Sequence, residues 1–246
     1  SEEDVLRKLE EIVEELERSN RDAVRRLEEV VKRVEDLWEE VVRRLRELVR
    51  EVEERLRDVE AKEVVEELVK VLEEAVRIVE KALRDHVEVL RRVVEKIADL
   101  LRRNVDVLRR VVEKLKRILE ARRRVDEKEV RKRLDDIRKE LEDVLRETRK
   151  TVKKIEDDLR RVHKRLDEII EDLKRRLKEV LKRVEEKGVK KKEIEEIIER
   201  VLRLLAELLK RVKRISEDLK RLLDELIEEN ADILRKLDEL VTRDET

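Results

Sequence analysis

The sequence predicts an all-α protein, a single-chain antiparallel up-down-up-down four-helix bundle with very long, nearly untwisted helices. Three observations favour this fold. The 246 residues include no proline and one glycine, and 56% of them are charged, a composition typical of long helices and coiled coils. Apolar residues recur every 18 positions, and three similar octets divide the chain into four parts of nearly equal length.

The 18-residue repeat predicts long, straight helices. In the first part of the chain Leu9, Leu27 and Leu45 recur at this interval, as do apolar doublets such as Val30 and Val31. Eighteen residues make about five helical turns, so these side chains form one stripe along a helix face. A repeat of about 3.5 residues per turn would twist the helices into a left-handed supercoil, and one of about 3.67 into a right-handed one. The intermediate period therefore predicts little supercoiling.

The three octets predict the loops between helices. They cover residues 57–64, 123–130 and 187–194, and the apolar stripe loses its phase near residue 59. Gly188 suits the left-handed residue that closes a helix, and Asp126 with Glu129 has the spacing of a capping box. Loops this short force successive helices to run antiparallel. We therefore expect one domain, 1–246, with helices at about 2–57, 60–123, 126–187 and 190–244 and loops near 58–60, 124–126 and 188–190.

Charge and composition exclude several classes of protein. The 68 basic and 69 acidic residues nearly balance, whereas a nucleic-acid-binding protein carries a basic excess on one face. Cysteine is absent, which removes disulfides and thiolate metal sites. No apolar run is long enough to span a membrane, and the first residues do not read as a signal peptide. We expect a soluble protein with no nucleic-acid or membrane partner and no cofactor.

A few polar residues interrupt the apolar stripe, and folding the chain at the joints brings them together. Reflection about positions 59.5, 124.5 and 188.5 places Asn104 near Thr148, and Thr148 beside Asn230. The same operation places Asn20 within about a turn of Asn104. The sequence therefore predicts one polar level in the core, the Asn/Thr layer, made of Asn20, Asn104, Thr148 and Asn230.

A second polar level follows from the same reflection. His86 falls opposite His163, and His163 falls opposite position 214, two residues from Ser216. Trp38 falls opposite position 81, within about a turn and a half of His86. The sequence therefore predicts a Trp/His layer made of Trp38, His86, His163 and Ser216.

Both layers have a structural interpretation. An unpaired buried polar group costs about 1–3 kcal/mol, so such layers stabilise only the register in which every partner meets. The simpler alternative is a solvated position at the edge of the stripe, which suits Ser19, Thr151 and His163 best. Two imidazoles also supply half of a zinc shell, which makes His86 and His163 the candidate metal ligands, although Ser216 is a poor third ligand. Ser216 with a histidine also suggests a nucleophile, but the sequence shows no oriented acid.

The uniform repeat, the recurring loop octets and the single aromatic residue, Trp38, resemble de novo designed, parametric helical bundles with buried polar layers. The resemblance covers the whole chain. It implies a hyperstable, monomeric structural scaffold with no natural biochemical function and no enzyme activity. The alternative is an interaction module or switch, in which two helical hairpins, 1–123 and 126–246, use the polar layers to specify their pairing.

Overall fold

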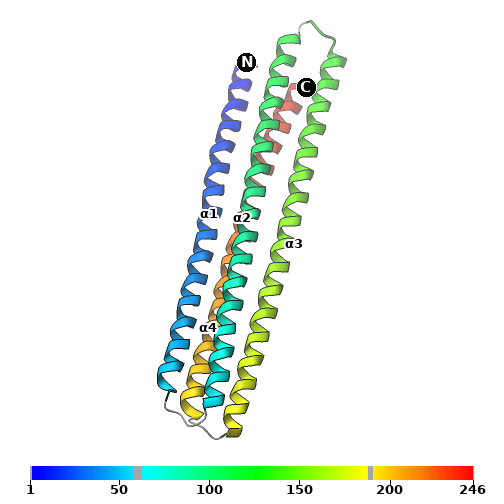
Figure 1. Ribbon diagram of the computed structural model, residues 1–246. Coiled ribbons are helices and arrows are strands. Elements are labelled where there is room, and N and C mark those ends of the chain that lie inside the picture. Colours follow the sequence, from blue (N-terminus) through cyan, green and yellow to red (C-terminus); the bar gives the residue numbers. More distant parts are fainter. Residues whose placement is uncertain (1, 58–61, 123, 188–190, 246) are drawn as a thin grey trace. The chain divides into compact units, whose positions relative to one another are not determined.

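A computed structural model describes residues 2–57, 62–122, 124–187 and 191–245 of the chain (Figure 1). Within these residues the chain forms four long α-helices. Their bounds are α1 Glu2–Arg55, α2 Lys62–Ala121, α3 Glu127–Lys187 and α4 Lys191–Glu245. The predicted fold class, an all-α four-helix bundle, is confirmed.

The helices form because the sequence repeats its apolar residues with a helical period. Leu9, Leu27 and Leu45, which are spaced 18 residues apart, are each at most 2% exposed. The intervening positions are dominated by Glu, Lys and Arg, which are good helix formers. No large apolar side chain is exposed among the described residues, so the stripe is fully used in packing.

The chain divides into two compact units, and every helix contributes a segment to each. Unit 1 consists of residues 1–28, 92–157 and 219–246, and unit 2 consists of residues 29–91 and 158–218. Each unit holds a piece of all four helices, and the single domain, 1–246, stays a prediction.

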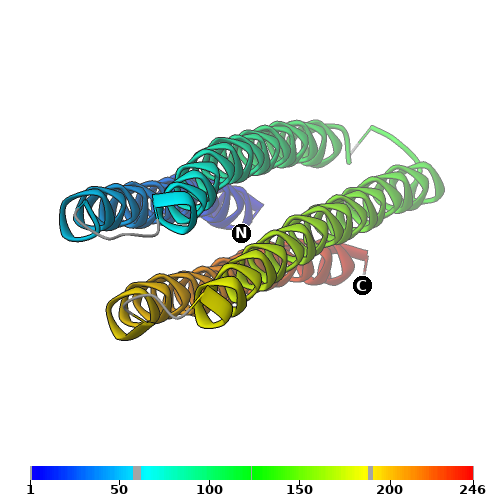
Figure 2. The ribbon, with the colours of Figure 1, turned by 60° about the horizontal axis from the view of Figure 1, so that its bottom comes forward.

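In unit 2, the helix neighbours follow the order α1, α2, α3, α4 and back to α1 (Figure 2). Residue numbers rise along one helix as they fall along the next, which makes each pair antiparallel. The ion pairs and contacts that show this are Glu35–Arg91 and Arg46–Glu80 for α1 and α2, Glu67–Arg183 and Glu74–Arg176 for α2 and α3, Asp167–Lys213 and His163–Ser216 for α3 and α4, and Glu51–Arg200 and Glu40–Arg211 for α4 and α1.

Unit 1 repeats this arrangement around its own apolar cluster. The cluster takes buried Leu, Val and Ile from all four helices, including Leu16, Leu108, Leu134 and Leu237. Polar contacts again join successive neighbours: Glu17–Arg109, Lys114–Glu140, Arg138–Asp238 and Ser19–Glu229. Each unit is therefore a four-helix bundle in cross-section, with its polar layer in its core.

The loop between α2 and α3 shows why α3 begins where it does. The carbonyl of Asp126 accepts hydrogen bonds from the amides of Glu129 and Val130, at 3.0 and 3.2 Å. Asp126 is thus the N-cap and α3 starts one residue after the predicted position. The first helix ends at Arg55 rather than 57, and the second begins at Lys62 rather than 60. The predicted loops at 58–60 and 188–190 lie outside the described residues.

Candidate functional site

The polar residues that interrupt the stripe are the only side chains of the described core with chemistry beyond packing. Asn20, Asn104, Thr148, Asn230 and His86 are buried. Ser19, Thr151, His163 and Ser216 are half-buried. All members of the Asn/Thr layer belong to unit 1, and all members of the Trp/His layer belong to unit 2.

The Asn/Thr layer is held by two separate hydrogen-bonded pairs. Between α1 and α4, Nδ2 of Asn230 donates to Oδ1 of Asn20 at 3.2 Å and to the carbonyl of Leu226 at 2.7 Å. Between α2 and α3, Nδ2 of Asn104 donates to Oγ1 of Thr148 at 3.0 Å, and Thr148 donates to the carbonyl of Val144. The layer therefore joins α1 to α4 and α2 to α3.

One amide nitrogen of this layer, Nδ2 of Asn20, has no hydrogen-bond partner among the described residues. The bond from Asn230 to the Leu226 carbonyl fixes which atom of Asn230 is the donor, and therefore Asn20 must present its oxygen to Asn230. Nδ2 of Asn20 is then left buried, with no hydrogen-bond partner among the described residues. An unpaired buried amide of this kind costs about 1–3 kcal/mol.

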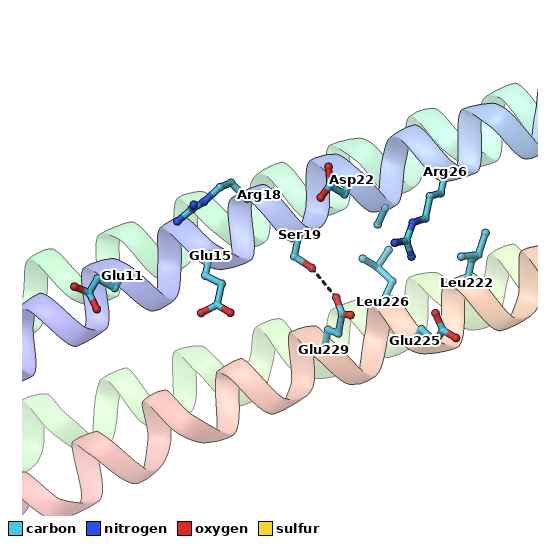
Figure 3. Close-up of a pocket in the computed structure, with 11 residues that line it drawn as sticks. Glu11, Glu15, Arg18, Ser19, Asp22, Arg26, Leu222, Glu225, Leu226 and Glu229 are labelled. Atoms are coloured by element: carbon cyan, nitrogen blue, oxygen red, sulfur yellow. Dashed lines mark hydrogen bonds between the residues drawn. The ribbon is translucent and has the colours of Figure 1, made fainter.

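Ser19 lies beside the layer and faces a groove between α1 and α4 (Figure 3). Its hydroxyl donates to the carboxylate of Glu229 at 2.6 Å. The groove, of 740 Å³, is lined by more carboxylates than guanidinium groups, including Glu11 and Glu15 against Arg18 and Arg26. Ser19 thus acts as a polar link at the edge of the stripe.

The Trp/His layer also contains two bonded pairs. Between α1 and α2, Nε1 of Trp38 donates to Nδ1 of His86 at 3.1 Å, and both side chains are buried. Between α3 and α4, Oγ of Ser216 contacts Nε2 of His163, and the Ser216 hydroxyl also donates to the carbonyl of Val212 at 2.9 Å. The layer therefore joins α1 to α2 and α3 to α4.

The two histidine rings lie next to each other. Their centroids are 6.1 Å apart with an interplanar angle of 71°, an edge-to-face arrangement. Burial lowers the pKa of His86 to about 4, and the nearby His163 acts in the same direction. Burial also lowers the pKa of His163, although the carboxylate of Asp167 opposes the shift and the ammonium of Lys213 adds to it. Both imidazoles are therefore neutral at pH 7.

The register between α1 and α2 differs from the sequence-based expectation. Reflection about 59.5 places position 84 opposite Glu35, whereas the structure pairs Glu35 with Arg91, about two turns further along α2. This shift brings Trp38 directly against His86. Reflection treats the joint as symmetric, whereas the ion pairs of α1 with α2 are offset from it by about two turns.

The geometry of His86 does not fit a metal ligand. A histidine that binds a metal through one nitrogen usually donates its other N–H to an acceptor. Here the second nitrogen of His86 instead receives a hydrogen from Trp38, so the proton of the neutral ring must remain on Nε2. No group of three or more potential metal ligands is present within the described part of the chain.

Ser216 is not arranged as a nucleophile. Its hydroxyl proton is donated to the Val212 carbonyl within α4, and Asp167, the acid nearest to His163 in sequence, forms an ion pair with Lys213 at 3.5 Å. A serine in the middle of a helix is also surrounded by amides already bonded along the helix, so no oxyanion hole is available. The Ser216–His163 contact instead joins two helices.

Taken together, the two layers join all four neighbouring helix pairs, each pair once. The Asn/Thr layer bonds α1 to α4 and α2 to α3, and the Trp/His layer bonds α1 to α2 and α3 to α4. Reflection at the joints predicts the partners of Asn104 and His163, but it could not predict the bond between Asn20 and Asn230. Helices α1 and α4 share no loop, so no joint relates them in sequence.

The chain matches no known protein-family model, no curated protein sequence and no solved structure. Among its described helices, none combines the length and the apolar character needed to cross a lipid bilayer.

Proposed function

We propose that this chain is a designed, monomeric and hyperstable structural scaffold, whose buried polar residues specify which helices are neighbours. The observation that carries this proposal is that the two layers join different pairs of helices. Four side-chain bonds in two layers join four different helix pairs. The remaining donors of Asn230, Thr148 and Ser216 are used on carbonyls of their own helices.

The physical reason is that apolar packing alone does not distinguish one helix neighbour from another. Stripes of Leu, Val and Ile with the same period can slide by a turn or exchange partners at small cost. A buried amide or imidazole that misses its partner is penalised in every such alternative. The layers therefore favour one register, while the apolar stripe supplies most of the stability.

A variant without the Asn/Thr layer tests this role. In Asn20→Leu/Asn104→Leu/Thr148→Val/Asn230→Leu, we expect the free energy of unfolding to stay equal or rise, because apolar side chains of similar size replace polar ones. We also expect more than one helix register or oligomer, measured by light scattering and by distances between spin labels. The control carries four exposed substitutions on the same helices: Asp22→Asn, Asp106→Asn, Glu147→Gln and Asp232→Asn. A layer variant that remains a monomer in one register would overturn the proposal.

A second candidate function is an interaction module made of two hairpins, α1 with α2 and α3 with α4. One observation favours it: both bonds of the Asn/Thr layer cross from one hairpin to the other, whereas both bonds of the Trp/His layer stay within a hairpin. The Asn/Thr layer is thus placed where it would select a partner hairpin, and the Trp/His layer where it would hold each hairpin together.

Cleavage of the full chain separates the two candidates. A protease site inserted between Arg122 and Asp126 allows the folded protein to be cut between the hairpins, which are then parted in denaturant and mixed again. An interaction module re-forms a one-to-one complex of the two hairpins, and the Asn230→Leu variant loses this stoichiometry. If the cut hairpins yield only mixed or self-associated species, the interaction module is excluded.

A further inference from the structure

Among the described residues, the Trp/His layer contains one buried donor with no acceptor. His86 is 2% exposed, and its Nε2 has no hydrogen-bond partner among the described residues. A neutral imidazole carries one N–H and one bare nitrogen. Because Trp38 donates to Nδ1 of His86, Nδ1 is the bare nitrogen and Nε2 carries the hydrogen. His86 is therefore a fixed donor at Nε2.

The opposite ring, that of His163, presents a hydrogen-bond acceptor. Ser216 has one hydroxyl proton, which it donates to the carbonyl of Val212. In its contact with His163, Ser216 must then accept, and Nε2 of His163 donates. Nδ1 of His163 is consequently the bare nitrogen of that ring. It is an acceptor in the same layer as the unpaired donor of His86.

The two rings do not bond to each other directly. Their centroids lie 6.1 Å apart in an edge-to-face arrangement. The charged groups facing His163, Asp167 on α3 and Lys213 on α4, are paired with each other at 3.5 Å. A molecule that joins the two rings must be small, and it must both accept a hydrogen bond and donate one. Water meets these requirements, and buried waters occupy such polar sites between protein groups.

We propose that one water molecule is bound between His86 and His163, where it accepts from Nε2 of His86 and donates to Nδ1 of His163. This binding site is independent of the scaffold role. With the water, hydrogen bonds run in one direction from Trp38 through His86, the water, His163 and Ser216 to the carbonyl of Val212. The two bonded pairs of the layer then become one chain across all four helices, and both histidines are held in the Nε2–H tautomer.

Nuclear magnetic resonance of the full chain, labelled with ¹⁵N, tests the site directly because the protein has only two histidines. We expect both rings to show a protonated Nε2 and a bare Nδ1 at pH 7.5. We also expect a nuclear Overhauser cross-peak between the Nε2 hydrogen of His86 and water, with the sign that a bound, long-lived water gives. Protonation of His163 on Nδ1, or a through-bond coupling between His86 Nε2 and His163 Nδ1, would overturn the proposal.

A matched variant locates the water. His163→Phe keeps an aromatic ring in the layer but removes the acceptor, so the water cross-peak of His86 should be lost while Trp38 still holds the His86 tautomer. An unchanged cross-peak in this variant would place the water elsewhere and overturn the proposal. The wild-type spectrum decides the question even if the variant does not fold.

Discussion

The indole Nε1 of Trp38 donates a hydrogen bond to Nδ1 of His86 at 3.1 Å, and this bond determines which nitrogen of the histidine carries its proton. Both side chains are buried, so the ring cannot exchange the bond for one with solvent. A protonated His86 would carry hydrogens on both nitrogens and would present one of them to the indole N–H. The bond is therefore compatible only with the neutral ring.

Stability should fall in mild acid because of His86. Its pKa is about 4 in the folded protein and about 6.5 when unfolded, so the unfolded chain binds more protons between these values. The contribution of the neutral His86 to the free energy of unfolding is complete above pH 6.5 and is lost as the pH falls toward 4. We expect the free energy of unfolding to drop by about 2 kcal/mol from pH 8 to pH 5, with a further loss of the same sign from His163. Denaturant titrations at the two pH values measure this.

The His86→Leu variant is the control for that prediction. It removes the buried imidazole, so the difference between pH 8 and pH 5 should shrink to the part that comes from His163. Equal stability at the two pH values in both the wild type and the variant would contradict the burial of a neutral His86.

Zinc should not bind the Trp/His layer. Coordination at Nε2 of His86 requires that nitrogen to give up its hydrogen, which Trp38 prevents by occupying Nδ1. We expect stoichiometric zinc to leave the melting temperature and the histidine resonances of the wild type unchanged. A zinc-dependent shift of the His86 resonances that disappears in His163→Phe would show a two-imidazole site and contradict this expectation.

Thr148 and Thr151 offer a matched pair one helical turn apart on α3. Thr148 accepts from Asn104 and donates to the carbonyl of Val144, so Thr148→Val leaves the Asn104 amide buried without an acceptor. We expect a loss of about 1–3 kcal/mol in the free energy of unfolding. Thr151 is half-buried, and Thr151→Val should change stability by less than about 0.5 kcal/mol. Equal effects of the two substitutions on stability would contradict the Asn104–Thr148 bond.

The two asparagines that join α1 to α4 should respond unequally to replacement. Asn230→Leu leaves Asn20 with neither its acceptor nor its donor paired, whereas Asn20→Leu leaves Asn230 bonded to the Leu226 carbonyl. We therefore expect Asn230→Leu to be less stable than Asn20→Leu, by about 1 kcal/mol.

The double variant Asn20→Leu/Asn230→Leu completes the thermodynamic cycle. It should be more stable than Asn230→Leu alone, because no amide remains unpaired between α1 and α4. The coupling free energy comes from chemical denaturation of all four proteins. Additive effects of the two substitutions would contradict the bond between these side chains.

Much of the fold follows from the sequence because its period is uniform. The 18-residue repeat predicts the stripe, and residues such as Leu27 and Leu45 are buried where the stripe places them. The start of α3 is predicted within one residue, because Asp126 supplies a clear N-cap. The first joint carries no equivalent signal, and there the predicted helix ends differ from Arg55 and Lys62 by two residues each.

The composition of the layers is predictable, but only part of the bonding within them is: reflection predicts the partners of Asn104 and His163 and misses that of Asn20. A polar residue in an apolar stripe can be found from sequence, as Asn104 and His86 show. Which pairs bond depends on the depth of each helix in the bundle and on side-chain direction. The α1–α2 register differs by about two turns from simple reflection, and Asn20 bonds to Asn230 on a helix with which it shares no loop. The 18-residue repeat specifies neither this register nor the bond partner of Asn20.

The bond between Asn20 and Asn230 also bears on chain connectivity. This bond makes α1 and α4 neighbours although no loop joins them. The first residues of α1 and the last residues of α4 both belong to unit 1. A circular permutant that joins these two ends and opens the chain between Arg122 and Asp126 would keep every side-chain bond of both layers. The helices would then follow one another as α3, α4, α1 and α2 with unchanged neighbours. In this protein the order of the helices along the chain is separable from their order around the core.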